Sequence, residues 1–435
     1  MQDKTVRELL LSVLFCGIFS ILSPALSGQD MAEKLDLKTA LSLGLENHPA
    51  LVAAAVAVSS TEGLVRQSGT RPNPLFVAQS ENWRFYGDPA FRVGSDLDLF
   101  LYVSQPIERG GRRERRIELS SQERHIAELR QKDLEWKVRQ DIKRAYWLAL
   151  LAQRERELIQ ENVSFFGQVT AYHEARVREG AMAGVDLIRV QLEEDKLRLQ
   201  EESAEVELQR ALADLVKVMG LPPPRTWFIL EDRPQDLSDK GATVGELARL
   251  ALGSRTDLRL IEAEVELARR EVDLEVARSK QDWNVMLGYK RTEGFNTVLA
   301  GLSIPLPIFD KNVGNVYFRQ SEVDRMEALL REKQAQAQVE IRGAADVLSK
   351  RLTMLEQVEP GMVQRAEESW NIAEAAYREG ATDLLRLLDA QRSRSEVRLL
   401  RNRVRLEVQI GIVDLEKAVG TDGPPIGLET FRAQN

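Results

Sequence analysis

The chain has 435 residues and a formal net charge of −8; 29% of its residues are charged and only 6% are aromatic. Acidic charge is spread along the chain, and no basic patch is interleaved with aromatic residues, which argues against nucleic acid as a partner. Glu, Arg, Leu and Ala recur at heptad-like spacings, a composition typical of long helices.

The N-terminal segment has the features of a secretory signal peptide. Two basic residues precede an apolar stretch from Leu9 to Leu22, and small residues before Gly28 suit a cleavage site near Ser27. The stretch is shorter than the roughly 20 residues that a transmembrane helix needs. We therefore expect residues 1–27 to be removed. Cys16, the only cysteine, would be removed with them, leaving a mature chain without a thiol or a lipid.

The mature chain is predicted to begin with a helix over residues 35–67. Asn47-His48-Pro49 interrupts this amphipathic pattern and marks the start of a second helical segment. Residues 245–281 have the same character, with Ser254–Leu258 in the place of the break. This correspondence predicts that the chain is internally duplicated.

Four segments alternate apolar residues with polar or small ones, two in each half of the chain. They are Leu75–Trp83, Leu97–Val103, 283–290 and 298–304. Strands of about ten residues with one apolar face are typical of a transmembrane barrel, although an ordinary half-buried sheet shows the same alternation. Four strands cannot close a barrel, and a barrel in lipid must leave no unpaired edge. Several chains would therefore have to combine their strands.

Long helices follow the strands in both halves. One helix is predicted from Arg112 to Glu179, which at 1.5 Å per residue is on the order of 100 Å long. The chain is predicted to reverse at Gly180. The corresponding helix of the second half is predicted to be two helices in series, because Pro360-Gly361 interrupts it. The basic start, Arg112–Arg116, is either a solvated face or a contact for acidic lipid headgroups.

Residues 172–220 match residues 372–420 without a gap, so that Gly180 corresponds to Gly380. Each return helix has two apolar stripes with a seven-residue period. In the first copy they consist of Val190, Leu197, Ala204, Ala211 and Val218, and of Leu199, Val206 and Ala213. Two positions apart on a helix is about 200°, so the stripes lie on nearly opposite faces. Such helices need a neighbour on each side and are expected to form a wall.

These patterns divide the chain into five parts. We predict a signal peptide at 1–27, a first repeat at 28–220, a polar connector at 221–244, a second repeat at 245–420 and a tail at 421–435. Each repeat is expected to run helix, strands, long helix, turn, long helix.

Three motifs beside the strands carry a resemblance to a known family. Arg71-Pro-Asn-Pro-Leu75, the segment Gln105–Arg113 and the segment Ile304–Gly314 resemble the TolC-like outer membrane efflux proteins, most closely the cation-efflux branch. The resemblance implies a mainly α fold with a membrane β-barrel: a homotrimer with twelve barrel strands in outer membrane lipid, continuous with a helical tunnel through the periplasm. It also implies two partners, a periplasmic adaptor protein and an inner-membrane pump, which we expect to be proton-driven.

The same resemblance places function at the helical turns. By motif position, Asp186 and Asp389 match acidic residues that line the tunnel entrance, and Tyr377 matches a tyrosine of the closing hydrogen-bond network. Arg386 departs from the drug-efflux pattern, which has an acidic residue there. Three copies of Asp389 would form a ring that attracts cations, and Arg386 would offset part of its field. The alternative is that all four residues form salt bridges without a gating role.

The turns themselves are the expected docking sites for the adaptor. They centre on Arg178 and Gly180 in the first copy and on Arg378 and Gly380 in the second.

Enzyme chemistry has little support. His48, His125 and His173 are far apart in the sequence, and no zinc-protease motif or phosphate-binding glycine loop occurs. We expect His125 and His173 to be exposed helix residues, and we expect neither a cofactor nor a tight metal site, because the methionines are also scattered.

The sequence leaves three hypotheses. The first is the exit duct of a tripartite efflux pump, with heavy-metal cations ahead of drugs as cargo. The second is the same kind of duct serving type I protein secretion. The third is a soluble periplasmic helical scaffold whose strands form a β domain.

Overall fold

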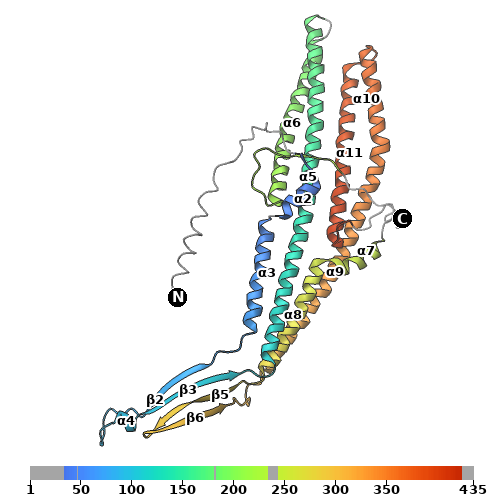
Figure 1. Cartoon of the computed structure of the whole chain (residues 1–435). Coiled ribbons are helices and arrows are strands. Elements are labelled where there is room, and N and C mark those ends of the chain that lie inside the picture. Colours follow the sequence, from blue (N-terminus) through green and yellow to red (C-terminus); the bar gives the residue numbers. More distant parts are fainter. Residues whose placement is uncertain (1–33, 47, 181–182, 234–242, 424–435) are drawn as a thin grey trace, which may run out of the picture.

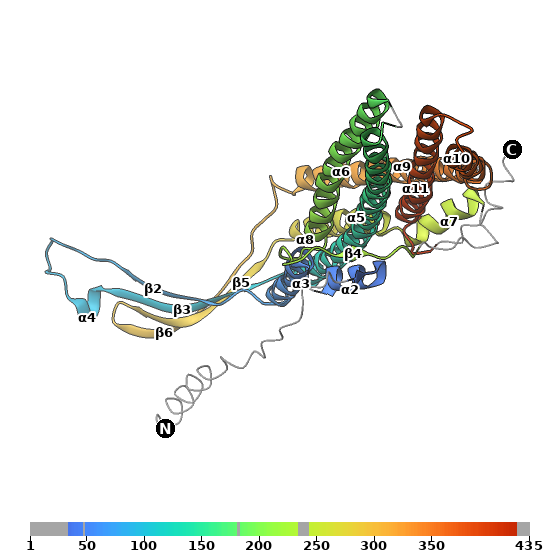
Figure 2. The same cartoon turned by 90° about the horizontal axis from the view of Figure 1, so that it is seen from above.

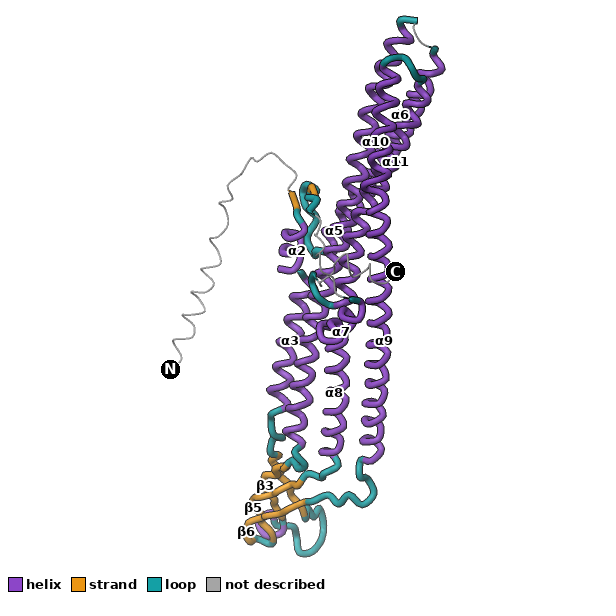
Figure 3. Tube along the Cα trace, turned by 90° about the vertical axis from the view of Figure 1, so that its right-hand side faces the viewer, coloured by secondary structure: helices purple, strands orange, loops and turns teal. Residues whose placement is uncertain are grey.

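The computed structural model describes residues 34–46, 48–180, 183–233 and 243–423. The molecule is elongated, with a β-sheet at one end and long helices that run lengthwise away from it (Figures 1 and 3). Seen from above, the sheet projects well to one side of the helices (Figure 2). Two helical hairpins form the end opposite the sheet.

The sheet has four antiparallel strands in the order β2-β3-β5-β6. Their bounds are Leu75–Glu81 for β2, Asp98–Ile107 for β3, Trp283–Thr292 for β5 and Phe295–Ser303 for β6, and the short helix α4 (Val93–Asp96) precedes β3. Leu287 lies opposite Val103, so these two side chains share a face. All four predicted strands are present. Within the described residues β2 and β6 are unpaired edges, so closure into a barrel remains a prediction.

The helices account for most of the described chain. They are α2 (Leu37–Glu46), α3 (Pro49–Ser68), α5 (Arg112–Arg178), α6 (Gly184–Val218), α7 (Val244–Ser254), α8 (Thr256–Arg278), α9 (Val313–Gln357), α10 (Val363–Arg378) and α11 (Leu384–Val419). α5 has 67 residues, which corresponds to about 100 Å. It packs against α3, α6, α8 and α11 and is therefore the central helix of the molecule.

Two hydrophobic cores hold these helices together near mid-length. The first surrounds Tyr146 and Trp147 of α5, both fully buried. The Tyr146 hydroxyl lies 2.9 Å from the carbonyl oxygen of Leu35 and 2.8 Å from that of Glu231. These residues lie in or next to β1 (Lys34–Leu35) and β4 (Ile229–Leu230), which pair in parallel. The second core joins α7, α9 and α11.

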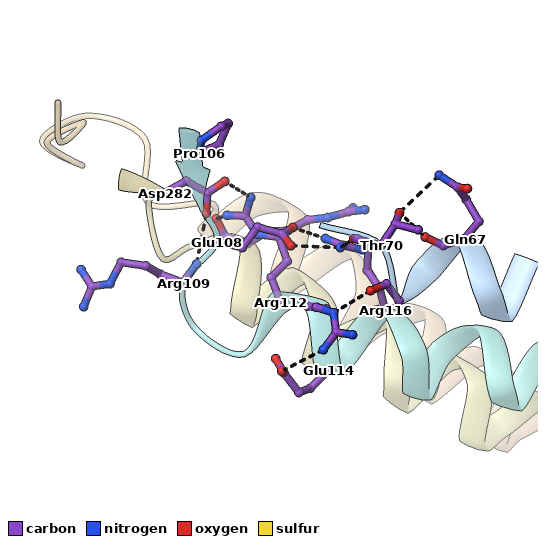
Figure 4. Close-up of polar contacts among 12 residues, drawn as sticks. Gln67, Thr70, Pro106, Glu108, Arg109, Arg112, Glu114, Arg116 and Asp282 are labelled. Atoms are coloured by element: carbon purple, nitrogen blue, oxygen red, sulfur yellow. Dashed lines mark hydrogen bonds and ion pairs between the residues drawn. The ribbon is translucent and has the colours of Figure 1, made fainter. Parts of the chain in front are cut away.

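Polar contacts fix the sheet to the helices (Figure 4). Arg112, the first residue of α5, donates to Asp282 at 2.7 Å and to the carbonyl oxygen of Lys280 at 2.8 Å. Arg116 pairs with Glu108 and also reaches the carbonyl oxygen of Thr70. The basic start of α5 is therefore engaged with protein groups and is more than a solvated face, whereas its contact with lipid headgroups remains a prediction.

The helical stretch of the second half differs from the prediction at Pro360-Gly361. α9 and α10 are joined by a π-helical turn at Val358–Met362 and form one continuous path. Proline has no backbone N–H and cannot make the normal i to i−4 bond, and the wider turn accommodates this loss without breaking the helix. The two predicted helices in series are thus a single helix with a local bulge.

The break near residue 48 is present as predicted. His48 precedes α3 and its Nδ1 accepts from the backbone N–H of Ala50, whereas Asn47 lies outside the described residues. Among the helices that the structure describes, none is long and apolar enough on its own to cross a membrane. The pair α2 and α3, bent by 41°, meets that test only when taken together.

Candidate functional site at the helical tips

The two hairpin tips reverse in the same way. Gly180 ends the α5 side with φ of +71°, and Gly380 ends the α10 side with φ of +75°. Side chains other than glycine rarely adopt these backbone angles. A Cβ atom at either position would meet nothing within 4 Å, so the backbone angle, and not space, requires glycine. Residues 181–182 of the first turn lie outside the described part of the chain.

The arginines beside the tips are exposed. The Arg378 guanidinium pairs with Glu374 one turn earlier at 2.8 Å. Arg178 makes one weak contact, 3.4 Å from its Nε to the carbonyl oxygen of Glu174. Both side chains stay on their own helix and leave the tips available to a partner. Adaptor docking there remains a prediction.

Tyr377 joins the two hairpins just before the tips. Its hydroxyl oxygen lies 2.9 Å from Nε2 of His173 on α5, and the two rings stack with centroids 6.2 Å apart. His173 is fully buried, which corrects the prediction that it is an exposed helix residue. The error arose because the residue that covers it lies 204 positions away in the sequence.

Burial affects both members of this pair. It lowers the pKa of His173, and nearby Arg176 acts in the same direction, whereas Asp186 opposes it. Burial also raises the pKa of the Tyr377 hydroxyl. Both groups are therefore neutral near pH 7, as a hydrogen bond between an imidazole and a phenol requires.

Of the four predicted gate residues, the structure brings Asp186 and Tyr377 to the same place. Asp186 lies in the first turn of α6, close enough to influence the pKa of both His173 and Tyr377. Its carboxylate is 3.9 Å from Arg189 on the same helix, and no hydrogen bond to Tyr377 is formed. Tyr377 thus bonds to a histidine and not to the acid.

Arg386 and Asp389 lie apart from this pair, on the first turns of α11. Both are exposed, and neither side chain forms an ion pair with any described residue. The backbone N–H of Arg386 donates to Asp383, which caps the helix at 3.0 Å. Within one chain, therefore, the salt-bridge alternative has no support for these two residues.

Asp389 faces a groove between α6 and α11. The groove has a volume of about 670 Å³ and is lined by both acidic and basic side chains, including Glu193, Lys196 and Arg392. Its floor is α5, where Asn162 accepts from Gln391 at 2.9 Å in a buried contact. This contact was not predicted. Gln191 and Gln391 occupy the same position in the two copies, and this repetition was the feature of the sequence that could have indicated the contact.

Metal binding has no obvious location in this region. Among the described residues, no three His, Cys, Asp or Glu side chains are placed to hold one ion together.

The model of the family described as outer membrane efflux protein matches residues 40–221 and 247–421. The chain is 26% identical over 373 residues to the cobalt-zinc-cadmium resistance protein CzcC of Cupriavidus metallidurans, covering 85% of this chain and 86% of that protein. It is 23% identical over 340 residues to the nickel-cobalt-cadmium resistance protein NccC of Alcaligenes xylosoxydans xylosoxydans, covering 74% and 75%.

Solved structures share the fold. CusC aligns over 93% of this chain and 99% of its own, with a TM-score of 0.71 at 17% identity. A membrane protein from Pseudomonas aeruginosa aligns over 92% and 96%, with a TM-score of 0.73 at 18% identity. The matched segments together cover most of the chain, and they confirm the resemblance inferred from the strand motifs. The chain belongs to the outer membrane efflux protein family.

Proposed function

We propose that this protein is the outer-membrane exit duct of a tripartite efflux pump, that three copies close into one channel, and that its cargo is heavy-metal cations. The family is one of outer membrane efflux proteins, and its structural neighbours are channels and not enzymes. The proposal adds the trimer, the partners and the cargo.

One observation supports the trimer: the two return helices, α6 and α11, differ in how much of the same apolar stripe is buried. In α11 the corresponding stripe is Leu399, Leu406 and Val413; Leu399 is partly buried, and Leu406 and Val413 are buried against the rest of the chain at 3% and 2% exposure. The matching stripe of α6 is open, with Leu199 72% exposed and Val206 61% exposed. Since the two helices carry the same pattern, α6 lacks the neighbour that α11 has. A second copy of the chain supplies it.

The opposite side of the molecule is also open. Val339 of α9 is 73% exposed and Ile372 of α10 is 71% exposed. The sheet has matching free edges at β2 and β6. A wall with two complementary open edges closes by head-to-tail contacts between identical copies, and such contacts form a ring when the rotation closes. Three copies would give the twelve strands that the resemblance implies.

A soluble scaffold is the competing function. It would leave the outward face of the sheet, including Leu287 at 63% exposure and Val298 at 78%, in water. Contiguous exposed apolar surface of this kind marks a protein or membrane contact. The family and the sheet surface together favour the membrane duct.

The cargo is inferred from the relatives and from charge. CzcC and NccC are named for resistance to cobalt, zinc, cadmium and nickel. In a trimer the exposed Asp389 would be present three times near the tunnel entrance, and a ring of carboxylates attracts cations. An adaptor at the tips and an inner-membrane pump would deliver the ions.

Deletion of the gene tests this function. Cells without the protein should become sensitive to cobalt, zinc or cadmium salts, and a plasmid copy should restore resistance. Hydrophobic drugs serve as the control cargo and should show a smaller effect. Equal sensitisation to drugs and metals, or sensitisation to drugs alone, would contradict the cargo assignment.

A further inference from the structure

His173 occupies a special position between the two hairpins. It lies on α5 within two turns of the tip, and among the described residues its contact with Tyr377 is the polar link between the hairpins that lies nearest the tips. The next one, between Asn162 and Gln391, lies 11 residues further back along α5, or about 16 Å. The separation of the tips therefore depends on the His173 contact more than on any other described hydrogen bond.

The hydrogen bonds define the tautomer of His173. Its Nδ1 lies 3.0 Å from the carbonyl oxygen of Val169, which can only accept. Nδ1 must therefore carry the proton and donate. In a neutral imidazole the other nitrogen then has a free lone pair, so Nε2 accepts from the O–H of Tyr377. In this arrangement a neutral imidazole satisfies both ring nitrogens and gives the Tyr377 hydroxyl an acceptor, whereas a second proton would place a charge on a fully buried ring.

Protonation would change this arrangement. Nε2 would become a donor facing the Tyr377 hydroxyl, which would have to turn its own proton away. The charged groups that face the imidazole are Arg176 of its own helix and Asp186 of α6. The nearby residues Leu384 and Leu388 of α11 are apolar, and Tyr172 of α5 presents its ring at 5.6 Å. The one acid that faces an imidazolium thus belongs to the first hairpin and not to the second.

We propose that His173 and Tyr377 form a pH-sensitive latch, which holds the two hairpins together at the tips while His173 is neutral and releases α10 when His173 is protonated. The proposal rests on the proposed function in one respect, namely that the tips are the entrance of the duct. When it is protonated, His173 gives up its contact with Tyr377 of the second hairpin and pairs with Asp186 of the first.

The direction of the pH effect follows from the lowered pKa of His173. In the released state this histidine would titrate near its ordinary value of about 6.5. The latched state binds the proton less well, so latching is fully favoured above about pH 6.5 and is lost as pH falls through the lowered pKa. Acid conditions should therefore open the tips.

Spin labels at the tips test the latch in the purified full-length channel. The substitutions Glu179→Cys and Glu379→Cys place labels beside the two exposed turns, and the expected mature chain has no other cysteine. The distance between labels should be short and narrowly distributed at pH 7.5, and it should lengthen and broaden by pH 5. In a His173→Gln background, where the amide oxygen can accept from Tyr377 without titrating, the distance should stay unchanged over this range.

Tyr377→Phe is the matched control, because it keeps the ring and removes the donor. Its label distance at pH 7.5 should resemble that of the wild type at pH 5. An unchanged distance in the wild type down to pH 5, or the same pH response in His173→Gln, would overturn the latch. The label distances are measured without cargo or pump, so the experiment can contradict the latch without contradicting the efflux function, and the reverse.

A measurement on the wild type covers the case in which the variants do not fold. The chain has only three histidines, so ¹⁵N labelling of histidine gives few signals to assign. His173 should show a protonated Nδ1, and its pKa should lie below the ordinary histidine value of about 6.5. A protonated Nε2 at neutral pH would overturn the proposal.

Discussion

The two ends of the helical stack are held together by different kinds of contact. At the sheet, charged side chains with several partners fix the start of α5, as Arg112 does with Asp282 and two backbone carbonyl oxygens. At the tips, one neutral hydrogen bond between His173 and Tyr377 joins the hairpins. Hydrogen bonds to charged groups contribute about 1.5 to 3 kcal/mol and neutral ones about 1 kcal/mol. By their polar contacts, therefore, the sheet end is held more firmly than the tip end, where the hairpins otherwise meet through apolar side chains.

The largest effect is expected from a charge on the outward face of the sheet. Leu287→Arg should impair membrane assembly by about 2 to 4 kcal/mol if this position lies at mid-bilayer depth. Leu101, on the same face of β3, should behave alike, because it lies opposite Tyr289 in the register. The yield of heat-modifiable trimer in the outer membrane measures this effect.

Met286→Arg is the control on the opposite face of β5, which already carries Lys290. It should assemble nearly normally. Equal yields of trimer from Leu287→Arg and from the wild type would contradict the assignment of the lipid face.

A smaller effect is expected at the junction between sheet and helices. Arg112→Ala leaves Asp282 without its partner and should lower the free energy of unfolding by about 2 kcal/mol. Arg178→Ala at the exposed tip should change it by less than about 0.5 kcal/mol. Thermal unfolding of the two purified variants compares the ends directly. Equal losses would show that the junction is no more firmly held than the tip.

The tip glycines should matter for transport more than for assembly. Gly380→Val forces a branched side chain to adopt φ of +75°, at a local cost of about 1 to 2 kcal/mol. Gly253→Val is the control, because Gly253 lies within α7, has no positive φ and has open space around its Cβ position. Gly380→Val cells should lose metal resistance with normal amounts of trimer, and Gly253→Val cells should keep it. Normal resistance in both would remove the tip from the transport mechanism.

The smallest effect concerns charge at the entrance. Arg386→Asp adds three carboxylates near the proposed Asp389 ring, so single-channel recordings should show greater cation selectivity and stronger block by divalent ions. The difference should shrink as salt rises, because the Debye length falls from about 10 Å at 0.1 M to about 3 Å at 1 M. Unchanged selectivity at low salt would mean that these side chains do not face the lumen.

Much of the architecture could be predicted because it depends on local periodicity. Apolar alternation located all four strands, and the absence of proline between Arg112 and Glu179 predicted the long α5. The left-handed turns at Gly180 and Gly380 also follow from a local requirement, the backbone freedom of glycine. Such features need only the residues within one element.

The remaining features depend on partners distant in the sequence. His173 looked like a surface residue because nothing near it in the chain indicates that Tyr377 covers it. The stripes of α6 and α11 look alike, yet only that of α11 is covered within the chain. Arg112 at the start of α5 similarly depends on Asp282, which is 170 residues away. Periodicity shows that a face needs a partner, but it does not identify the partner.

Native mass spectrometry is the most direct test of the proposed trimer. Protein extracted from the outer membrane fraction in mild detergent should give a single species of three chains. That result would mean that the open edges at α6 and at α9 and α10 close on one another. A monomer from the same extract, or a protein recovered in the soluble periplasmic fraction, would contradict the proposed channel.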